Sequence, residues 1–459
     1  MKEFHVKHPF ITRMIIRFIK FLNIVAMGAV FSYIWYKYFS WRVLVPFFHR
    51  GNWYVILLFM FLYTVFGRVY DAFSVSYLKQ SETIYSQALS VFISDFFMYI
   101  VIMLLIRSYT VNPVPMLICF LIQLCISVLW TLVSHSWYFS TFYRKKSIII
   151  WDEREGLESV IEQHDLNKKF DIIKVMNVTD VINNGLKDLD GMEIVFFAGV
   201  HSKQRNIIIK YCVQNNLVSF IIPRVGDVLM ASAHKMHMLH LPVLRLTRYN
   251  PAPEYLFIKR LFDIVISLIG IIILSPFMIV TAIAIKTDGG PALYKQTRLT
   301  KDGKEFKVLK FRSMKVDAEK DGVARLSTGE KDDRITKVGH IIRAIRFDEL
   351  PQLFNILKGD MTIVGPRPER PEIAKQYYEE LPEFELRLQC KAGLTGYAQV
   401  YGKYNTTPYD KLLMDLMYIS NPSILQDLAI MFATVKILFM KDSTEGVDEN
   451  QVTASINQK

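Results

Sequence analysis

Four apolar segments in the first third of the chain set the strongest limit on its fold. They cover residues 18–36, 51–67, 83–106 and a part of 108–143. Because a helix needs about 20 mostly apolar residues to cross a bilayer, these segments predict a four-helix transmembrane bundle over residues 1–143. Asp95 is the one acid inside them. An acid at membrane depth is either a functional group or a polar contact between helices, and the sequence leaves both interpretations open.

Loop cations predict the orientation of this bundle. With the N-terminus in the cytoplasm, ten lysines and arginines lie on the cytoplasmic side and four on the other side. This bias favours a cytoplasmic N-terminus, and four crossings then return the chain to the cytoplasm at Arg144. The formal net charge of +12 suits a membrane surface or phosphate-bearing ligands, while the apolar first third argues against a nucleic-acid partner.

Residues 144–250 predict a Rossmann-like α/β domain. β-prone runs at 147–151, 171–176, 193–197 and 218–222 alternate with helical stretches such as 157–163 and 204–214. This alternation is typical of a parallel sheet with crossover helices. The turn at 151–156 carries acids where a dinucleotide site needs glycines, so we expect that this domain has lost nucleotide binding.

Two polar clusters of this domain are weak candidates for a metal site. Asp188 and Asp190 form an Asp-x-Asp motif, which a solvated turn explains better than a bound cation. His234, His237 and His240 are spaced by three, and a helix would fan them apart. A zinc site is therefore the weaker interpretation.

A fifth apolar segment, residues 264–285, has basic flanks and carries Ser275 and Pro276 at its centre. Proline interrupts helical hydrogen bonding, and a serine hydroxyl can satisfy a carbonyl that the interruption frees. We therefore predict a re-entrant helix-break-helix over residues 251–286, which enters and leaves the membrane by the cytoplasmic face. The alternative is a kinked helix that crosses the membrane.

The last domain, residues 287–441, is small, and a polar tail follows it at 442–459. It opens with a predicted hairpin of strands at 294–299 and 305–311. A charge-rich loop at 316–333 comes next, which we expect to be mobile. An apolar run at 424–440 fits either an interfacial helix or a core helix.

Asp348 and Glu349 are the strongest candidates for chemistry in this domain. Pro351 is tolerated in a first helical turn and apolar residues follow it, so Asp348 is predicted to be a helix N-cap. Such a position keeps an aspartate ionised and available as a nucleophile. Glu349 could share a Mg²⁺ ion or move a proton. Three arginines can offer planar forks to phosphate oxygens: Arg343, Arg346 and Arg367. A capped helix with surface arginines is the alternative.

A set of short motifs makes the interpretation specific. They are residues 259–263, Ser275-Pro276, 310–314, 348–353, Asn355, 358–361, Gly365-Pro366-Arg367-Pro368 and 393–400. On these residues the chain resembles the bacterial polyprenyl-phosphate hexose-1-phosphate transferases, also called the bacterial sugar transferase family. The resemblance covers about residues 255–441. With its first two domains the chain is similar to the long form of the family, as in the undecaprenyl-phosphate glucose phosphotransferases of capsule and exopolysaccharide loci.

The resemblance implies a two-step reaction. Asp348 would attack the sugar-bearing phosphate of a UDP-sugar, with glucose as the expected sugar, expel UMP and form a phosphosugar–aspartyl intermediate. Undecaprenyl phosphate would then accept the sugar phosphate, which is the first membrane step of repeat-unit assembly. Glu349 would assist as metal ligand or proton carrier, and Asp348 and Glu349 would hold Mg²⁺ as the cofactor.

The resemblance also assigns binding and supporting residues. Lys310, Arg343, Arg367 and Gln399 would bind the phosphates and the substrate. Structural support would come from Asp263, Asp360, Pro366 and Pro368, and the Ser275-Pro276 break would set the depth of the re-entrant helix. The protein would be a multi-pass component of the bacterial plasma membrane. A second copy of the chain and downstream capsule glycosyltransferases are candidate partners.

Three other functions stay open on the sequence alone, and one of them is a bifunctional transferase whose transmembrane bundle also affects later export. The chain could be a non-catalytic membrane scaffold that recruits polysaccharide-assembly enzymes through its first two domains. A conventional glycosyltransferase that used Asp188 and Asp190 would release UDP instead of UMP.

Overall fold

The computed structural model describes residues 9–45, 47, 50–287, 289–315, 334–402 and 406–438. The chain divides into two compact units, Met1–Ile222 and Pro223–Lys459. The charge-rich loop at 316–333 and the polar tail at 442–459 lie outside the described residues.

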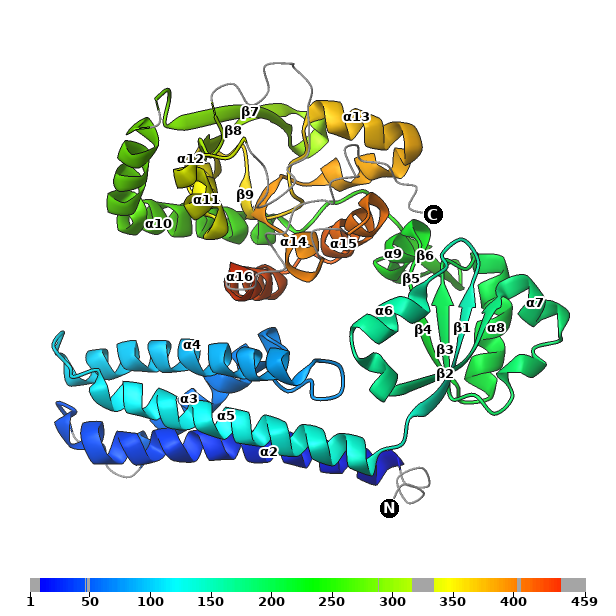
Figure 1. Ribbon diagram of the computed structural model, residues 1–459, viewed down its shortest axis with the longest axis horizontal. Coiled ribbons are helices and arrows are strands. Elements are labelled where there is room, and N and C mark those ends of the chain that lie inside the picture. Colours follow the sequence, from blue (N-terminus) through cyan, green and yellow to red (C-terminus); the bar gives the residue numbers. More distant parts are fainter. Residues whose placement is uncertain are drawn as a thin grey trace. The chain divides into compact units, whose positions relative to one another are not determined.

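Four long apolar helices begin the first unit (Figure 1). They are α2 (Pro9–Ile34), α3 (Arg50–Val69), α4 (Gln80–Ile106) and α5 (Val114–Thr141), with short helical turns at Trp35–Phe39 and Ser40–Arg42 after α2. Each packs against two others, in the cyclic order α2, α3, α4, α5. All four are long and apolar enough to cross a membrane, which confirms the length and composition that the sequence predicts.

Asp95 is a buried acid of α4, with 6% of its surface exposed. Neither of its carboxylate oxygens has a hydrogen-bond partner within the part of the chain that the structure describes. The interpretation of Asp95 as a polar contact between helices therefore has no support there, because no described residue forms a hydrogen bond with its carboxylate.

A four-stranded parallel sheet follows the helices, with strand order β2-β1-β3-β4. Its strands are β1 (Lys145–Trp151), β2 (Phe170–Asn177), β3 (Ile194–Ala198) and β4 (Val218–Ile221). The connections contain α6 (Leu157–Gln163), α7 (Val178–Asn183), α8 (Ser202–Gln214) and 3₁₀ turns at Leu166–Lys168 and Lys187–Leu189. Apolar clusters cover both faces of the sheet, as a parallel sheet requires. The predicted α/β domain with a parallel sheet is confirmed.

The Asp-x-Asp motif of this domain is engaged in local contacts. Asp188 accepts hydrogen bonds from Lys174 Nζ at 2.5 Å and Asn184 Nδ2 at 2.9 Å. Asp190 accepts one from the Tyr211 hydroxyl at 2.6 Å. These contacts support the interpretation as a turn.

The histidine-rich segment forms a hairpin, so the helix that we assumed there is wrong. β5 (His234–Met238) pairs antiparallel with β6 (Leu241–Arg245) in the second unit, after α9 (Val225–Ala231). Leu239 and His240 both adopt left-handed backbone angles, which is the geometry of a tight two-residue hairpin turn. Over the described ranges, no group of three His, Cys, Asp or Glu side chains could hold a metal ion.

The second unit is built around a long helix, α10 (Pro253–Thr287). The hairpin of β7 (Leu293–Leu299) and β8 (Glu305–Phe311) follows, as predicted. The remaining elements are α11 (Lys337–Ala344), a 3₁₀ turn at Phe347–Glu349, α12 (Gln352–Lys358), β9 (Thr362–Val364), α13 (Pro371–Glu380), a 3₁₀ helix at Pro382–Gln389, β10 (Gly393–Thr395), α14 (Tyr397–Tyr401), α15 (Pro408–Ser420) and α16 (Ile424–Leu438). β9 and β10 pair in parallel.

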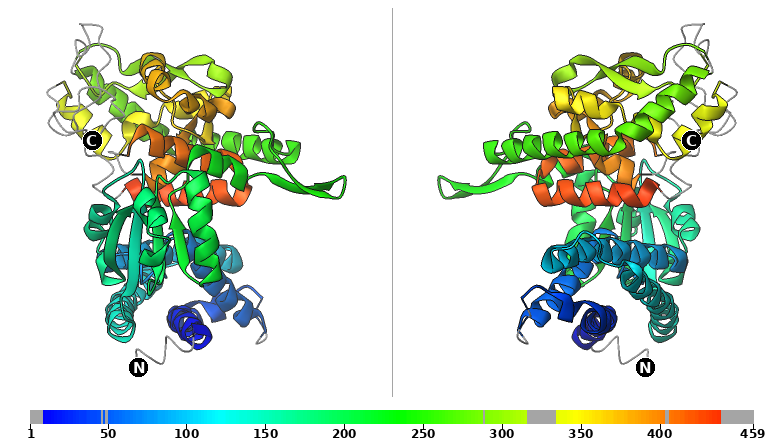
Figure 2. Two further views of the ribbon diagram at one scale, coloured as in Figure 1. Left: turned by 90° about the vertical axis from the view of Figure 1, so that its right-hand side faces the viewer. Right: turned by 90° about the vertical axis from the view of Figure 1, so that its left-hand side faces the viewer.

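α10 is one continuous helix that contains the residues of the predicted break. Its helical backbone continues through Pro276, while the ribbon changes direction on the way to β7 (Figures 1 and 2). The Ser275 hydroxyl donates to the Ile272 carbonyl at 2.9 Å. The predicted break is therefore corrected to a continuous helix, because local hydrogen bonds keep the chain helical around the proline.

Both ends of α10 bind the same small domain. Near its start, Lys259 Nζ donates to the Val364 carbonyl and to Asp427, each at 2.9 Å. Near its end, the Ile285 carbonyl accepts a hydrogen bond from Arg312 Nη2 at 3.0 Å. Asp427 belongs to α16, so one side of that helix is part of the domain core.

Candidate active site

Asp348 and Glu349 lie in the 3₁₀ turn between α11 and α12. The left-handed backbone of Arg346, with φ 53°, precedes this turn. The residue immediately before α12 is Pro351, so Asp348 does not cap the helix and its predicted role as N-cap is wrong. The chain tightens into i→i+3 hydrogen bonds ahead of the proline, which leaves the Asp348 carboxylate available for other contacts.

Glu349 is held by two cations from separate elements. Lys310, the second-last residue of strand β8, places Nζ 2.7 Å from Glu349 Oε1. Arg367, in the loop after β9, places Nη2 3.2 Å from the same oxygen, and the Glu349 side chain is only 13% exposed. Burial alone would raise the pKa of Glu349, but the nearby positive charges outweigh it and hold that pKa well below its usual range. Glu349 is therefore a fixed anion.

Asp348 differs from its neighbour because its carboxylate has no hydrogen bond or ion pair to any described residue. Burial, and then the negative charge of Glu349, raise the pKa of Asp348. Three cations oppose this shift without cancelling it: Lys310, Arg343 and Arg367. The expectation that a helix N-terminus keeps this aspartate ionised is thus corrected, since no cap forms and the pKa rises.

The loop that carries Arg367 is fixed through its backbone. The Gly365 amide donates to the Thr395 carbonyl, and the Gly393 amide donates to the Pro366 carbonyl, each at 2.9 Å. A Cβ at Gly365 would lie 2.4 Å from the Lys391 carbonyl oxygen. Only glycine allows this approach, so the sequence around Pro366 positions the Arg367 guanidinium beside Glu349.

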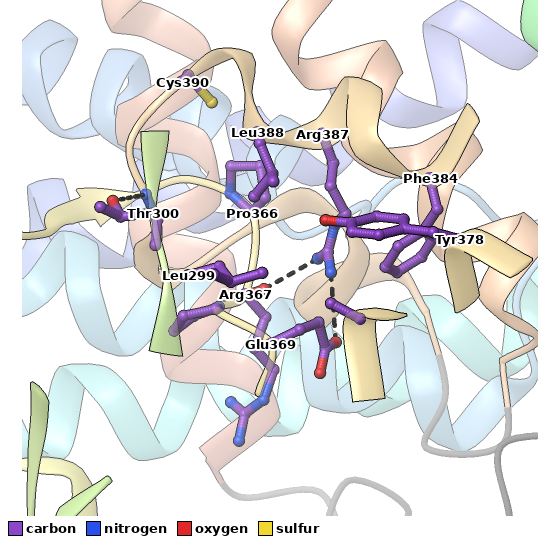
Figure 3. Close-up of a pocket in the computed structure, with 13 residues that line it drawn as sticks. Leu299, Thr300, Pro366, Arg367, Glu369, Tyr378, Phe384, Arg387, Leu388 and Cys390 are labelled. Atoms are coloured by element: carbon purple, nitrogen blue, oxygen red, sulfur yellow. Dashed lines mark hydrogen bonds and ion pairs between the residues drawn. The ribbon is translucent and has the colours of Figure 1, made fainter. Parts of the chain in front are cut away.

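Arg387 holds the same loop through contacts with Arg367 and Glu369 (Figure 3). Its Nη2 donates to the Arg367 carbonyl at 3.0 Å and its Nη1 lies 3.3 Å from Glu369. The Arg387 guanidinium also pairs with Asp415 at 2.6 Å, and only 4% of its side chain is exposed. Our sequence reasoning missed Arg387, Glu369 and Asp415, because no short motif joins residues so far apart in the chain.

A small cavity lies behind this loop (Figure 3). Its lining includes Leu299, Pro366, Arg387 and Cys390. The cavity has a volume of about 10 Å³, which is room for no more than a water molecule. It is therefore no site for a sugar nucleotide, and the open side of the acidic pair is the better candidate.

Two of the residues predicted to give structural support, Asp263 and Asp360, form contacts in different parts of the domain. Asp263 of α10 accepts hydrogen bonds from the Thr362 hydroxyl at 2.8 Å and the Ile363 amide at 2.9 Å, which ties α10 to β9. Among the described residues, the Asp360 carboxylate contacts Lys358 at 3.0 Å and Asn355 at 3.4 Å and not the acidic pair.

The other predicted residues also have defined positions. The Pro368 carbonyl accepts a hydrogen bond from Arg298 Nη1 at 3.0 Å. Arg343 lies in the last turn of α11. Gln399 lies in α14, where its Nε2 donates to the Leu394 carbonyl at 3.4 Å and its buried Oε1 has no hydrogen-bond partner within the described ranges.

The donor set of the acidic pair fits Mg²⁺ bound together with substrate. Mg²⁺ uses one or two carboxylates and keeps water and phosphate oxygens as its other ligands. Asp348 offers an unpaired carboxylate, while Glu349 already binds two cations. A Mg²⁺ ion would therefore depend on Asp348 and on the substrate's own oxygens.

Comparison with known proteins assigns the second unit, in which an apolar helix is joined to a small α/β domain, to a protein family. A family model described as bacterial sugar transferase matches residues 254–441. A relative from Caulobacter vibrioides, a UDP-glucose:undecaprenyl-phosphate glucose-1-phosphate transferase, is 40% identical over 191 residues, which are 40% of this chain and 71% of the relative. An exopolysaccharide production protein of Rhizobium leguminosarum is 43% identical over 190 residues, 39% of this chain and 94% of that protein. The chain belongs to the bacterial sugar transferase family.

Longer relatives match over a similar length of this chain. A UDP-N-acetylgalactosamine-undecaprenyl-phosphate N-acetylgalactosaminephosphotransferase of Aeromonas hydrophila is 40% identical over 203 residues, 43% of this chain. The chain spans 48% of that relative's length and 41% of an undecaprenyl-phosphate galactose phosphotransferase from Salmonella typhimurium. The family match begins at residue 254, so the first unit lies outside it.

Proposed function

We propose that the protein transfers a sugar-1-phosphate from a UDP-sugar to undecaprenyl phosphate and releases UMP. The observation that carries this proposal is an unpartnered carboxylate, Asp348, beside a carboxylate that Lys310 and Arg367 hold as an anion. Several relatives are named as transferases of glucose, galactose or N-acetylgalactosamine phosphate to undecaprenyl phosphate, which supports the reaction class.

In the first step, an oxygen of the ionised Asp348 carboxylate attacks the phosphorus that bears the sugar. The bond from this phosphorus to the bridging oxygen breaks, and UMP leaves with that oxygen and its electron pair. The product is a phosphosugar–aspartyl intermediate. Covalent catalysis of this kind divides one difficult displacement into two easier ones.

In the second step, a phosphate oxygen of undecaprenyl phosphate attacks the same phosphorus. The bond to Asp348 breaks, which restores the carboxylate and gives undecaprenyl-diphosphate-sugar. Because UMP leaves before the lipid reacts, the kinetics are expected to be ping-pong. This product would begin a repeat unit of a capsule or exopolysaccharide.

The cations of the site have distinct tasks in both steps. Lys310 and Arg367 fix Glu349 and present positive charge toward the phosphoryl group, with Arg343 on the neighbouring helix. Charge placed in advance where a reaction develops it lowers the barrier. Bound Mg²⁺ would supply further neutralisation of phosphate charge, with Asp348 and Glu349 as its protein ligands.

We infer that α10 is a re-entrant membrane helix. Its bend and the attachment of both its ends to one domain support entry and exit by the same face. The active site would then lie near the headgroups, where the phosphate of undecaprenyl phosphate lies. With the loop charges, this arrangement supports a multi-pass protein of the bacterial plasma membrane whose α/β domains face the cytoplasm.

Glucose is the sugar we expect, from the resemblance to glucose phosphotransferases. Relatives with other donors are equally similar over this region, so the donor has to be measured. A second copy of the chain and downstream capsule glycosyltransferases are the protein partners we propose to test.

The test is nucleotide release by the purified full chain in detergent, with Mg²⁺, undecaprenyl phosphate and a panel of UDP-sugars. We expect UMP from one donor and none from Asp348→Asn. Release of UDP instead would refute this chemistry and direct attention to Asp188 and Asp190. Polysaccharide synthesis that survives in cells carrying Asp348→Asn would support the non-catalytic scaffold.

A further inference from the structure

The first unit contains a cavity of about 370 Å³ where its apolar helices meet the α/β domain. The lining comes from residues 76–81 before and at the start of α4, from the last part of α5, and from residues 164–168 of the α/β domain. The volume falls within the range of ligand pockets, roughly 300–1,000 Å³. Only a few residues separate α5 from β1, so the cavity lies at the ends of the apolar helices.

Two lysines and two histidines are among the side chains that line this cavity. They are Lys79, Lys168, His135 and His164, and Asp165 is the one acid among the lining residues. Asp165 lies 3.9 Å from Lys79 and 3.8 Å from Lys168, so two lysines share one carboxylate. The two lysine side chains are 41% and 53% exposed, which leaves both free to turn toward a ligand.

Lys169 lies at the edge of the cavity. Its Nζ donates to the hydroxyl of Ser76 at 3.1 Å and lies 3.2 Å from the ring centre of Tyr77, and both of these residues line the cavity. Burial, followed by the charges of Lys145 and Lys20, lowers the pKa of Lys169 to about 7. A bound anion would favour the charged form of Lys169, and the two lysines of the lining share only one carboxylate.

The start of α4 faces the same space. Gln80 and Ser81 are its first residues and both line the cavity. Backbone N–H groups of a first helical turn have no acceptor within the helix and favour anions. The cavity thus combines lysines, histidines and the start of α4, where Glu82 accepts a hydrogen bond from the Lys79 amide at 3.4 Å.

We propose that this cavity binds a phosphate group, carried by an anionic phospholipid headgroup or present as free phosphate. Phosphate oxygens would accept hydrogen bonds from Lys79, Lys168 and the first amides of α4. The position at the ends of apolar helices favours the lipid headgroup, because basic pockets at that level attract anionic lipids.

The test uses the full chain in a neutral detergent, with two separate probes: dioleoylphosphatidylglycerol in mixed micelles and inorganic phosphate. Native mass spectrometry counts the bound lipid, and the midpoint of thermal unfolding reports binding of either probe. The double variant Lys79→Met/Lys168→Met should bind either probe about 25-fold more weakly. Each lysine contributes about fivefold, since one cation near an anionic surface is worth about 1 kcal/mol. The matched control, Lys203→Met with Lys210→Met, removes the same charge from the exposed side of α8 and should bind as the wild type does.

A variant with the opposite effect excludes misfolding as the explanation. Asp165 has a left-handed backbone, with φ 58°, which asparagine tolerates well. Asp165→Asn frees both lysines from their carboxylate and should tighten binding several-fold. If only phosphatidylglycerol raises the midpoint of thermal unfolding, the ligand is the lipid headgroup. If inorganic phosphate raises it equally, the ligand is free phosphate. Binding that is unchanged in the Lys79/Lys168 variant, or equally weakened in the control, would overturn the proposal.

Discussion

Lys310 Nζ lies 2.7 Å from Glu349 Oε1, and this contact joins the end of β8 to the turn that carries Asp348. It makes one carboxylate of the pair a fixed anion while the other remains without a partner in the described residues. The two acids therefore have different roles although they are adjacent in sequence. Glu349 organises the cations, and Asp348 is the group available to react.

Removing the Lys310 charge should reduce catalysis much more than stability. We expect Lys310→Met to lower kcat/KM for UMP release by about 10²–10³-fold, because a charge directed at the phosphoryl group is lost. Lys307→Met is the matched control, since Lys307 lies on the same strand with an exposed side chain. Equal activity of the two variants would contradict the role given to Lys310.

Asp348→Asn should abolish the covalent step without unfolding the protein. The loss of activity is expected to be about 10⁴-fold or more, as for removal of a nucleophile. Because burial raises the pKa of Asp348 above its unfolded value, the ionised form costs folding free energy at neutral pH. The neutral variant should therefore melt at the same temperature as the wild type or above it. Intact mass of the enzyme after incubation with the donor alone should show the sugar-phosphate adduct only in the wild type.

The pH dependence should report the ionisation of Asp348. Since the reactive form is the carboxylate and its pKa is raised, kcat/KM should fall as the pH drops through a value above that of an ordinary aspartate. The charge of Arg343 lowers the pKa of Asp348. Arg343→Gln should therefore raise this pKa and move the acidic limb, the part of the pH profile where kcat/KM falls toward low pH, to higher pH. A profile of kcat/KM between about pH 4.5 and 8 measures the shift. A limb that moves to lower pH would show that another group controls it.

Arg387 should matter mainly for stability. Arg387→Met leaves the buried carboxylates of Asp415 and Glu369 without their shared cation, which is expected to cost about 3–5 kcal/mol. Thermal unfolding of the full chain measures the loss. Adding Asp415→Leu to this variant should recover part of it, since one uncompensated charge is then gone. No recovery in the double variant would count against the charge explanation.

Glycine is required at position 365 by close packing. Gly365→Ala places a Cβ 2.4 Å from the Lys391 carbonyl, so we expect a loss of about 1–3 kcal/mol together with reduced activity through Arg367. Gly226→Ala is the control, because a Cβ there meets nothing within 4 Å and the position is helical. That change should stabilise the protein slightly. Similar melting temperatures for the two variants would show that the loop adjusts.

Local patterns in the sequence were sufficient for most of the elements. The strands predicted at 147–151 and 193–197 correspond to β1 and β3, because runs of Ile, Val and Phe that are buried on both faces define a parallel sheet. The hairpin of β7 and β8 follows from its turn residues in the same way. The acidic pair and its arginines were visible as a motif, since they lie within one short stretch.

Tertiary structure decided the features that depend on distant partners. The sequence alone determined that four apolar helices, a parallel sheet, a fifth apolar helix and a cation-rich acidic pair occur in this order. Only the fold showed that Lys310 and Arg367 both bind Glu349, that Asp348 lies in a 3₁₀ turn, and that Arg387 fixes the Arg367 loop. The reason is physical: helix and strand periodicity are encoded by neighbours a few residues apart. Charge pairing and pKa depend on burial and on groups that only packing brings together.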